Sequence, residues 1–76
     1  MESPIKEALI AVAGNVRDQR ILKNYTQKYV AERLGLSLNG YARIERGFSK
    51  MNMETMFKIA TVLDKPIKEL LTIKRY

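Results

Sequence analysis

The sequence predicts an all-α fold, a compact bundle of five short helices in a single domain. Apolar residues recur at helical spacing in segment after segment. No segment alternates apolar and polar residues with the β-branched enrichment of a strand. Residues that cap or end helices (Ser, Thr, Asn, Gly and Pro) stand between the apolar segments. With 76 residues, the chain has room for one domain with a small core.

The first helix is expected to begin at Ser3-Pro4 and to reach about Lys23. Ser3 can cap it, and proline at the first helical position loses no needed N–H. Gly14-Asn15 interrupts the apolar pattern, so this segment is either one long helix or two short ones. Its apolar stripe is formed by Ile5, Leu9, Val12 and Val16.

Residues 26–47 parse as two short helices joined by a tight turn. Thr26 is a good N-cap for the first of them, and Gly35 can take the left-handed conformation that ends it. Ser37 caps the second helix, which Gly47 closes. Two short helices with a glycine-containing turn between them form the helix-turn-helix pattern.

Two further helices are predicted after the loop at residues 48–51. Asn52 caps the fourth helix, and the break at Asp64-Lys65-Pro66 separates it from the fifth. The methionines fit core packing better than a binding surface. The inner face of the fourth helix is expected to hold Met53, Met56, Phe57, Ala60 and Leu63. Ile67, Leu70, Leu71 and Ile73 exceed what a short terminal helix must bury, which hints at a dimer contact.

The charge of the chain favours polyanionic partners. Fourteen Lys and Arg oppose eight Asp and Glu, a net charge of +6. Charge alone does not separate DNA from RNA, an acidic protein or an anionic membrane. The longest apolar run, residues 8–13, is far shorter than the ~20 residues that cross a bilayer, and Glu2 gives no basic signal-peptide start. A cytoplasmic protein without a membrane partner is expected.

The composition argues against an enzyme. The chain has no histidine, which removes a Ser–His pair and a His metal site, and no cysteine, which removes disulfides and thiolate metal sites. The glycines form no phosphate-cradling loop, and the acidic residues do not cluster at metal-binding spacing. We therefore expect no catalytic residue, no cofactor and no metal.

The residues from Val16 to Leu71 resemble the Cro and phage-repressor type helix-turn-helix family, also called XRE-like. The resemblance divides the chain into an N-terminal helical extension (1–15), a family-like core (16–71) and a tail (72–76). The role of the extension stays open. The matching residues are Val16-Arg17 and Arg20, then Thr26-Gln27, Val30-Ala31, Leu34-Gly35-Leu36-Ser37, Ile44-Glu45 and Gly47. Residues 53–63 and 67–71 match the downstream part of the family pattern.

The resemblance implies a lambda-repressor-like DNA-binding domain, in which the helix at 37–46 enters the major groove. Its base-reading positions fall on Leu38, Asn39 and Arg43. Asn39 can pair with adenine, Arg43 with guanine, and Leu38 can touch a thymine methyl group. Outward polar residues are often merely solvated, and Leu38 is alternatively an idle exposed leucine.

Phosphate contacts are implied for Gln27, at the start of the preceding helix, where free N–H groups already favour anions. The flanking candidates are Thr26, Lys28, Arg46 and Lys50. Gly40 is counted with them because a missing side chain allows close approach to DNA, although a helix weakened by drift explains this glycine equally well. A solvated charged surface is the other interpretation of these cations.

Two further positions carry structural expectations. Arg20 and Glu45 resemble a family ion pair between the first and third helices, whose loss would strand a charge. Tyr41 stands where the family usually has Ile or Val. Its ring is expected in the core, with the hydroxyl reaching a rim.

The sequence thus predicts a sequence-specific, double-stranded DNA-binding transcriptional regulator, of repressor or restriction–modification controller type. A homodimer on an inverted-repeat operator is expected, with half-sites roughly 34 Å apart. The dimer face is either residues 1–15 or residues 66–73. The alternative is a protein-interaction module, such as the antitoxin of a toxin–antitoxin pair. The operator, the regulated genes, the sign of regulation and any toxin partner stay open.

Overall fold

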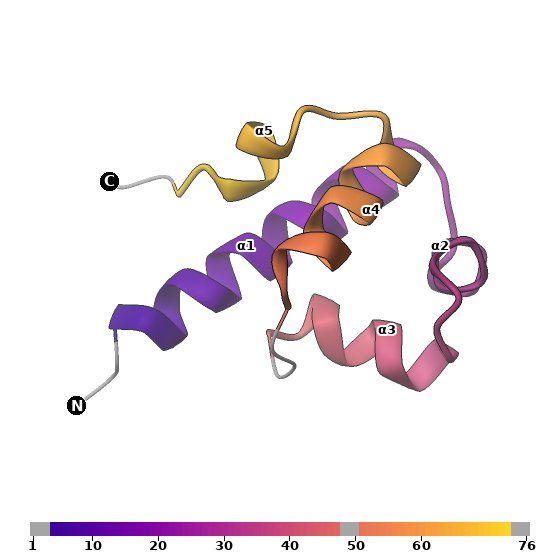
Figure 1. Cartoon of the computed structure of the whole chain (residues 1–76), viewed down its shortest axis with the longest axis horizontal. Helices are drawn as coiled ribbons and strands as arrows, with labels where there is room; N and C mark the ends of the chain where they lie inside the picture. Colours follow the sequence, from indigo (N-terminus) through magenta and orange to yellow (C-terminus); the bar gives the residue numbers. More distant parts are fainter. Residues whose placement is uncertain (1–3, 48–50, 74–76) are drawn as a thin grey trace.

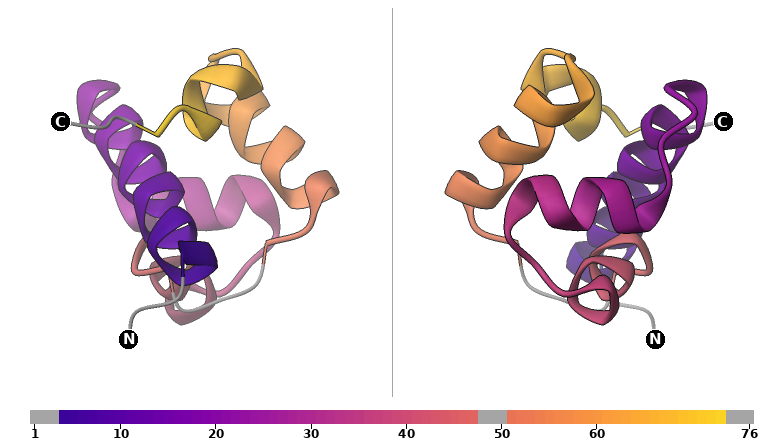
Figure 2. Two further views of the ribbon diagram at one scale, coloured as in Figure 1. Left: turned by 90° about the vertical axis from the view of Figure 1, so that its left-hand side faces the viewer. Right: turned by 90° about the vertical axis from the view of Figure 1, so that its right-hand side faces the viewer.

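The computed structural model describes residues 4–47 and 51–73, and within them it contains five helices and no strand. The helices are α1 (Pro4–Leu22), α2 (Gln27–Leu34), α3 (Leu38–Glu45), α4 (Met53–Leu63) and α5 (Ile67–Leu71). They pack into a body of 36 × 22 × 21 Å, in which α3 lies on the side opposite α5 (Figures 1 and 2). The predicted all-α bundle of five helices is confirmed.

Three helices begin at the side chains that the sequence indicates as caps. In each case a side-chain oxygen accepts a hydrogen bond from a first-turn N–H, which would otherwise lack a partner. The three bonds join the Thr26 hydroxyl to the Tyr29 N–H (2.9 Å), the Ser37 hydroxyl to the Gly40 N–H (3.0 Å) and the Asn52 carbonyl to the Thr55 N–H (2.8 Å). Ser3, the expected cap of α1, lies outside the described residues.

Within the described residues, a left-handed residue follows each of the first four helices. Gly35 ends α2 with φ +71°, and Gly47 follows α3 with φ +75°. Asn24 and Asp64 take the same region after α1 and α4, with φ 60° and 55°. Short polar side chains tolerate this conformation better than bulky ones do, so neither residue needs to be glycine.

The core lies where α1, α2, α3 and α4 meet, and α5 closes it. Helix α1 contacts α3, α4 and α5, and α2 contacts α3 and α4. Tyr41 is the largest side chain with no exposed surface. The other buried apolar residues of this cluster are Val16, Val30, Ala31, Ile44, Met56, Ile59, Ala60, Leu63 and Leu70.

Helix α1 is one continuous helix, so the interruption expected at Gly14-Asn15 does not divide it. The Asn15 amide instead donates to the carbonyl oxygens of Leu70 (2.9 Å) and Thr72 (2.6 Å). These carbonyls end α5, where no helical partner exists for them. Asn15 therefore attaches the C-terminal helix to the first.

The predicted inner face of α4 is partly wrong. Met53 and Phe57 are exposed by 56% and 54%, whereas Met56, Ala60 and Leu63 are buried together with Ile59. Helix α4 is apolar around much of its circumference, so periodicity alone does not fix which edge of the stripe faces inward. Met53 is consequently not core filler, although Met56 is buried and Met51 packs against the core.

The terminal helix leaves part of its apolar surface exposed. Leu70 is fully buried and Ile67 packs partly against the core. Leu71 and Ile73 remain exposed by 41% and 44%. In α1, Ile5 is exposed by 73% and Leu9 by 36%, because the first turns of this long helix extend past the bundle (Figure 1).

Candidate nucleic-acid interface

Helix α3 forms one edge of the molecule (Figure 1). Tyr41 and Ile44 bury its inner side. Leu38, exposed by 49%, and the exposed side chains of Asn39 and Arg43 occupy the outer side. The three residues expected to read bases therefore lie together on one accessible helix face.

The outer face of α3 carries positive charge without an exposed acid of its own. The one acidic residue of this helix is Glu45, whose side chain is 1% exposed. Arg43 and, at the end of the helix, Arg46 are both exposed. An anion approaching α3 therefore meets cations and no carboxylate from this helix.

Glu45 is held by Arg20 of α1. The Arg20 Nε and Nη2 atoms donate to the two carboxylate oxygens at 2.6 and 3.1 Å. Its third nitrogen, Nη1, donates to the Tyr25 carbonyl at 2.8 Å. The expected partners are thus brought together in a two-pronged pair, and the same guanidinium fixes the turn between α1 and α2.

This pairing keeps both groups ionised. Burial is the largest influence and raises the pKa of the Glu45 carboxyl, but the hydrogen bonds that its carboxylate receives and the charge of Arg20 together outweigh burial, so the pKa lies below its ordinary value. The hydrogen bond to Glu45 raises the pKa of Arg20, against the opposing effect of burial. Glu45 therefore remains a carboxylate at neutral pH despite its burial.

The Tyr41 hydroxyl does not reach a rim, contrary to the sequence-based expectation. It is buried near Glu45 and makes no hydrogen bond of good geometry with the described residues. Burial raises the pKa of the Tyr41 phenol above its ordinary value, and the Glu45 carboxylate raises it further. The Tyr41 ring occupies the core position at which the family usually has Ile or Val, and the core also surrounds the hydroxyl.

The first turn of α2 gathers three of the residues expected at phosphates. Thr26 caps the helix, Gln27 begins it, and Lys28 is exposed beside them. The Gln27 amide donates to Glu45 at 3.1 Å, so its side chain is anchored to the same carboxylate that Arg20 holds. Lys50 lies outside the described residues.

Gly40 lies in the first turn of α3. A Cβ at this position would lie 3.1 Å from the Ser37 hydroxyl oxygen, which accepts the capping hydrogen bond from the Gly40 N–H. The equivalent caps at Thr26 and Asn52 accept from Tyr29 and Thr55, so this cap does not by itself require glycine. The expected closeness of Gly40 to DNA stays a prediction.

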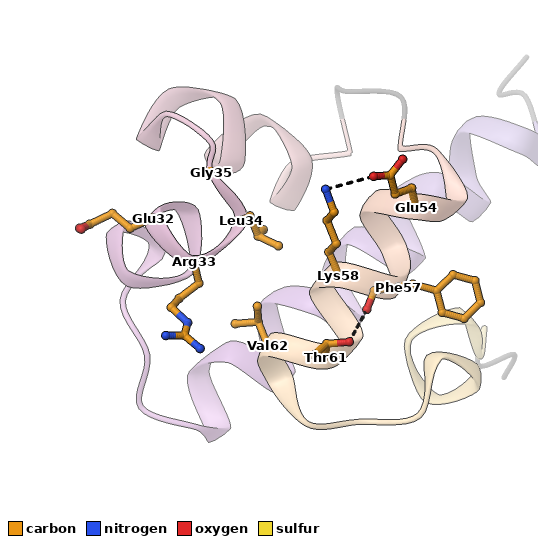
Figure 3. Close-up of a pocket in the computed structure, with 9 residues that line it drawn as sticks. All are labelled: Glu32, Arg33, Leu34, Gly35, Glu54, Phe57, Lys58, Thr61 and Val62. Carbon is orange, nitrogen blue, oxygen red and sulfur yellow. Dashed lines mark hydrogen bonds and ion pairs between the residues drawn. The ribbon is translucent and has the colours of Figure 1, made fainter.

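A groove separates α2 from α4, away from the outer face of α3. Its volume is about 940 Å³. Leu34, Phe57 and Val62 supply apolar surface, while Lys58 and Glu54 pair across one turn of α4 at 3.1 Å (Figure 3). The groove is mixed in polarity and carries no excess of one charge.

A family model described as helix-turn-helix matches residues 16–70. The chain belongs to this Cro and phage-repressor type, XRE-like helix-turn-helix family. The predicted family is confirmed. The family consists of transcription regulators, not enzymes, in agreement with the expectation from composition.

Named relatives of this helix-turn-helix chain include the transcriptional repressor RstR of the cryptic phage CTXphi from Vibrio cholerae. Two forms of it match, at 32% identity over 60 residues and 40% identity over 59 residues. These alignments cover 79% and 78% of this chain but 54% and 53% of the repressors. The chain thus spans about half the length of the curated relatives it matches.

Two solved structures share the fold. The restriction–modification controller protein C.AhdI from Aeromonas hydrophila aligns with a TM-score of 0.77 and 29% identity, covering 82% of this chain and 94% of the controller. A hypothetical transcription factor, NHTF, from Neisseria aligns with a TM-score of 0.80 and 29% identity, covering 95% of this chain and 82% of that protein.

Within the described residues, no helix has the length and apolarity needed to cross a membrane.

Two contacts around the helix-turn-helix could not be predicted from the sequence. The Asn15 amide binds carbonyls 55 and 57 residues away, and no local signal announces such a partner. Gly47 lies against the backbone of Ile10, in the extension upstream of the family match. A positive φ at Gly47 was foreseeable from its place after α3, but its neighbour was not.

Proposed function

We propose that this chain is a sequence-specific, double-stranded DNA-binding transcriptional regulator that works as a homodimer on an inverted-repeat operator. The outer face of α3 carries the proposal, because Asn39 and Arg43 project from the exposed side of a helix that has no exposed acid. The family membership and the named relatives, a phage repressor and a restriction–modification controller, support the same function.

In this proposal α3 enters the major groove and its outer residues read base edges. Arg43 donates two hydrogen bonds to the O6 and N7 atoms of a guanine, and Asn39 pairs with the N6 and N7 atoms of an adenine. Leu38, at the start of the helix, contacts a thymine methyl group. Such contacts give sequence preference, which phosphate contacts do not.

The first turn of α2 holds the backbone of the DNA. The N–H groups at the start of this helix favour a phosphate, and Thr26, Gln27 and Lys28 surround them. Arg46 extends the cationic surface at the far end of α3, with Lys50 as a further candidate. These contacts orient α3, so their loss weakens binding to every sequence alike.

Selection of bound sequences from random duplex DNA at moderate salt tests the proposal directly. We expect an inverted repeat whose half-sites are about one helical turn, or 10 bp, apart. Recovery of sequences without any common motif would contradict the proposed function.

Arg43→Ala then tests the reading of bases. We expect a loss of about 1–3 kcal/mol on the selected site and relaxed preference at one base position. Lys28→Ala is the matched control, an exposed cation removed from the phosphate-binding surface, and should weaken selected and scrambled duplexes equally. Equal weakening by Arg43→Ala would assign Arg43 to a phosphate instead.

A protein-interaction module is the second candidate, and the groove between α2 and α4 favours it. Leu34 and Val62 face each other between the two helices, while the Phe57 ring, exposed by 54%, projects from the other side of α4 (Figure 3). The dependence of binding on salt separates the two functions. For DNA, the logarithm of the affinity falls linearly with the logarithm of the salt concentration, with a slope of about 0.9 for each phosphate that is neutralised. Binding that is insensitive to salt would favour a protein partner, of which a toxin is one example.

A further inference from the structure

Helix α3 is attached to α1 at two places near its C-terminal end. The first is the ion pair of Arg20 with Glu45, with Nε–Oε2 at 2.6 Å. The second is a steric contact, in which Gly47 lies against Ile10. Ten residues of continuous helix separate Arg20 from Ile10, a distance of about 15 Å along the axis of α1.

The second contact is close enough to require glycine. A Cβ at position 47 would lie 3.0 Å from the Ile10 Cγ1 atom and 3.1 Å from its Cα atom. The backbone at Gly47 also has φ +75°, which other residues adopt at a cost of roughly 1–2 kcal/mol. The chain leaving α3 therefore passes directly over the backbone of α1.

Ile10 contributes little to the core of the domain. Its side chain is 45% exposed, and the buried cluster does not include it. It also precedes residues 16–70, the part that matches the helix-turn-helix family. The contact with Gly47 is thus made by a residue upstream of the family match.

We propose that Ile10 is a positioning residue, through which the N-terminal extension sets the angle of α3 against the DNA. Tyr41 and Ile44 pack the inner side of α3 and the ion pair fixes its C-terminal end, so the freedom that remains is a tilt of its outer face. A second contact some 15 Å along a rigid α1 restricts that tilt. This inference rests on the proposed function, because its consequence is the alignment of Arg43 and Asn39 with base edges.

Ile10→Ala tests the inference, because it removes the side-chain part of the contact with Gly47, the Cγ1 atom, and leaves the close approach of the two backbones. We expect affinity for the selected duplex to fall by roughly 5- to 150-fold, the range for one lost bidentate base contact. Affinity for a scrambled duplex and the slope of affinity against salt should not change, because the phosphate contacts from α2 remain. Urea unfolding, measured in parallel, should give the same free energy as for the control below.

Ile21→Ala is the matched control. Ile21 is also in α1, is 46% exposed, and lies on nearly the same side of the helix three turns further along. It has the same side chain to lose, but the extension contact with Gly47 stays intact. We expect this variant to bind the selected duplex as the wild type does.

Ile10→Val is the rescue variant, because valine keeps a γ carbon at the place of the Ile10 Cγ1 atom and should restore selective binding. Equal affinities of Ile10→Ala and Ile21→Ala for the selected duplex would overturn the inference while leaving the proposed function intact. An equal loss by Ile10→Ala on selected and scrambled duplexes would overturn it as well. Wild-type protein that does not distinguish the two duplexes would overturn the proposed function itself.

Discussion

Arg20 uses all three of its nitrogens at once, two on Glu45 and one on the Tyr25 carbonyl. Its side chain is 12% exposed and that of Glu45 is 1% exposed. Replacing a pair this deeply buried with apolar residues of the same shape often leaves stability unchanged. Removing Arg20 alone lowers stability, because the remaining carboxylate is then buried without a counter-charge.

Arg20→Ala should lower the free energy of unfolding by about 3–5 kcal/mol, since Glu45 would be left uncompensated. Equilibrium urea unfolding measures this change. Lys58→Ala is the control, because it breaks an ion pair with Glu54 whose side chains are 58% and 75% exposed. Exposed pairs of this kind contribute about 0.3–0.5 kcal/mol. If both variants lost the same small amount, the Arg20 pair would not be buried as described.

Tyr41→Phe should leave stability unchanged within about 1 kcal/mol or raise it slightly. The change removes a buried hydroxyl that has no partner among the described residues and keeps the ring that fills the core. Thermal unfolding checks the result. A loss of 2 kcal/mol or more would mean that the hydroxyl donates a hydrogen bond to Glu45.

At this scale the sequence predicts contacts within a motif better than contacts across the fold. Thr26, Ser37 and Asn52 were recognisable as caps because each acts on an N–H three residues away. The burial of Tyr41 followed from its spacing with Ile44, whereas the surroundings of its hydroxyl depend on α1 and could not be inferred. The exposure of Leu38, Asn39 and Arg43 followed from the same spacing, while their roles at bases stay a prediction.

At the scale of elements, glycine has opposite structural roles in α1 and at the end of α2. Gly14 lies in the middle of a continuous helix, and a Cβ there would meet no other atom within 4 Å. Gly35 is equally uncrowded, but it ends α2 in the left-handed region with φ +71°. Sequence alone reads both as interruptions.

Gly14→Ala should therefore raise the free energy of unfolding by up to about 1 kcal/mol, because alanine favours the helix without any clash. Gly35→Ala should lower it by roughly 1–2 kcal/mol, since alanine is strained at positive φ. Urea unfolding of the two variants side by side measures both effects. A loss of stability in Gly14→Ala would show that α1 needs a break at this point.

The helices themselves were more predictable than their orientation about their own axes. Capping residues have local causes, so the starts of α2, α3 and α4 could be placed from nearby residues. Helix α4 offers apolar side chains on several sides, and only packing against α1, α2 and α5 selects Met56 and Ile59 over Met53 and Phe57. Patterns along a chain do not contain that choice.

At the scale of the whole molecule, the positive charge and the small size bear on assembly. A single α3 reads few base pairs, and the net charge of +6 attracts any duplex. Sequence preference in the proposed function therefore depends on two copies reading two half-sites together. The exposed apolar residues at the free end of α1 and after α5 are candidates for their contact, as the sequence also suggested.

A change of half-site spacing should reveal this symmetry. Inserting 5 bp between the half-sites turns one of them to the opposite side of the duplex, so two-fold binding should be lost. Inserting 10 bp returns both half-sites to the same side of the duplex but places them one turn further apart. A rigid dimer cannot span the longer distance, so little binding should be recovered. Gel-shift titration measures each duplex. Unchanged affinity after the 5-bp insertion would indicate independent monomers.

The attachment of Asn15 to Leu70 and Thr72 also has a consequence for the order in which the chain folds. It spans 55 and 57 residues, whereas the hydrogen bond from Gln27 to Glu45 spans 18. Closing the longer loop costs about 1 kcal/mol more chain entropy. The five residues of α5 have little helical stability of their own before they dock. The C-terminal helix should therefore join last during folding and detach first when the native protein opens.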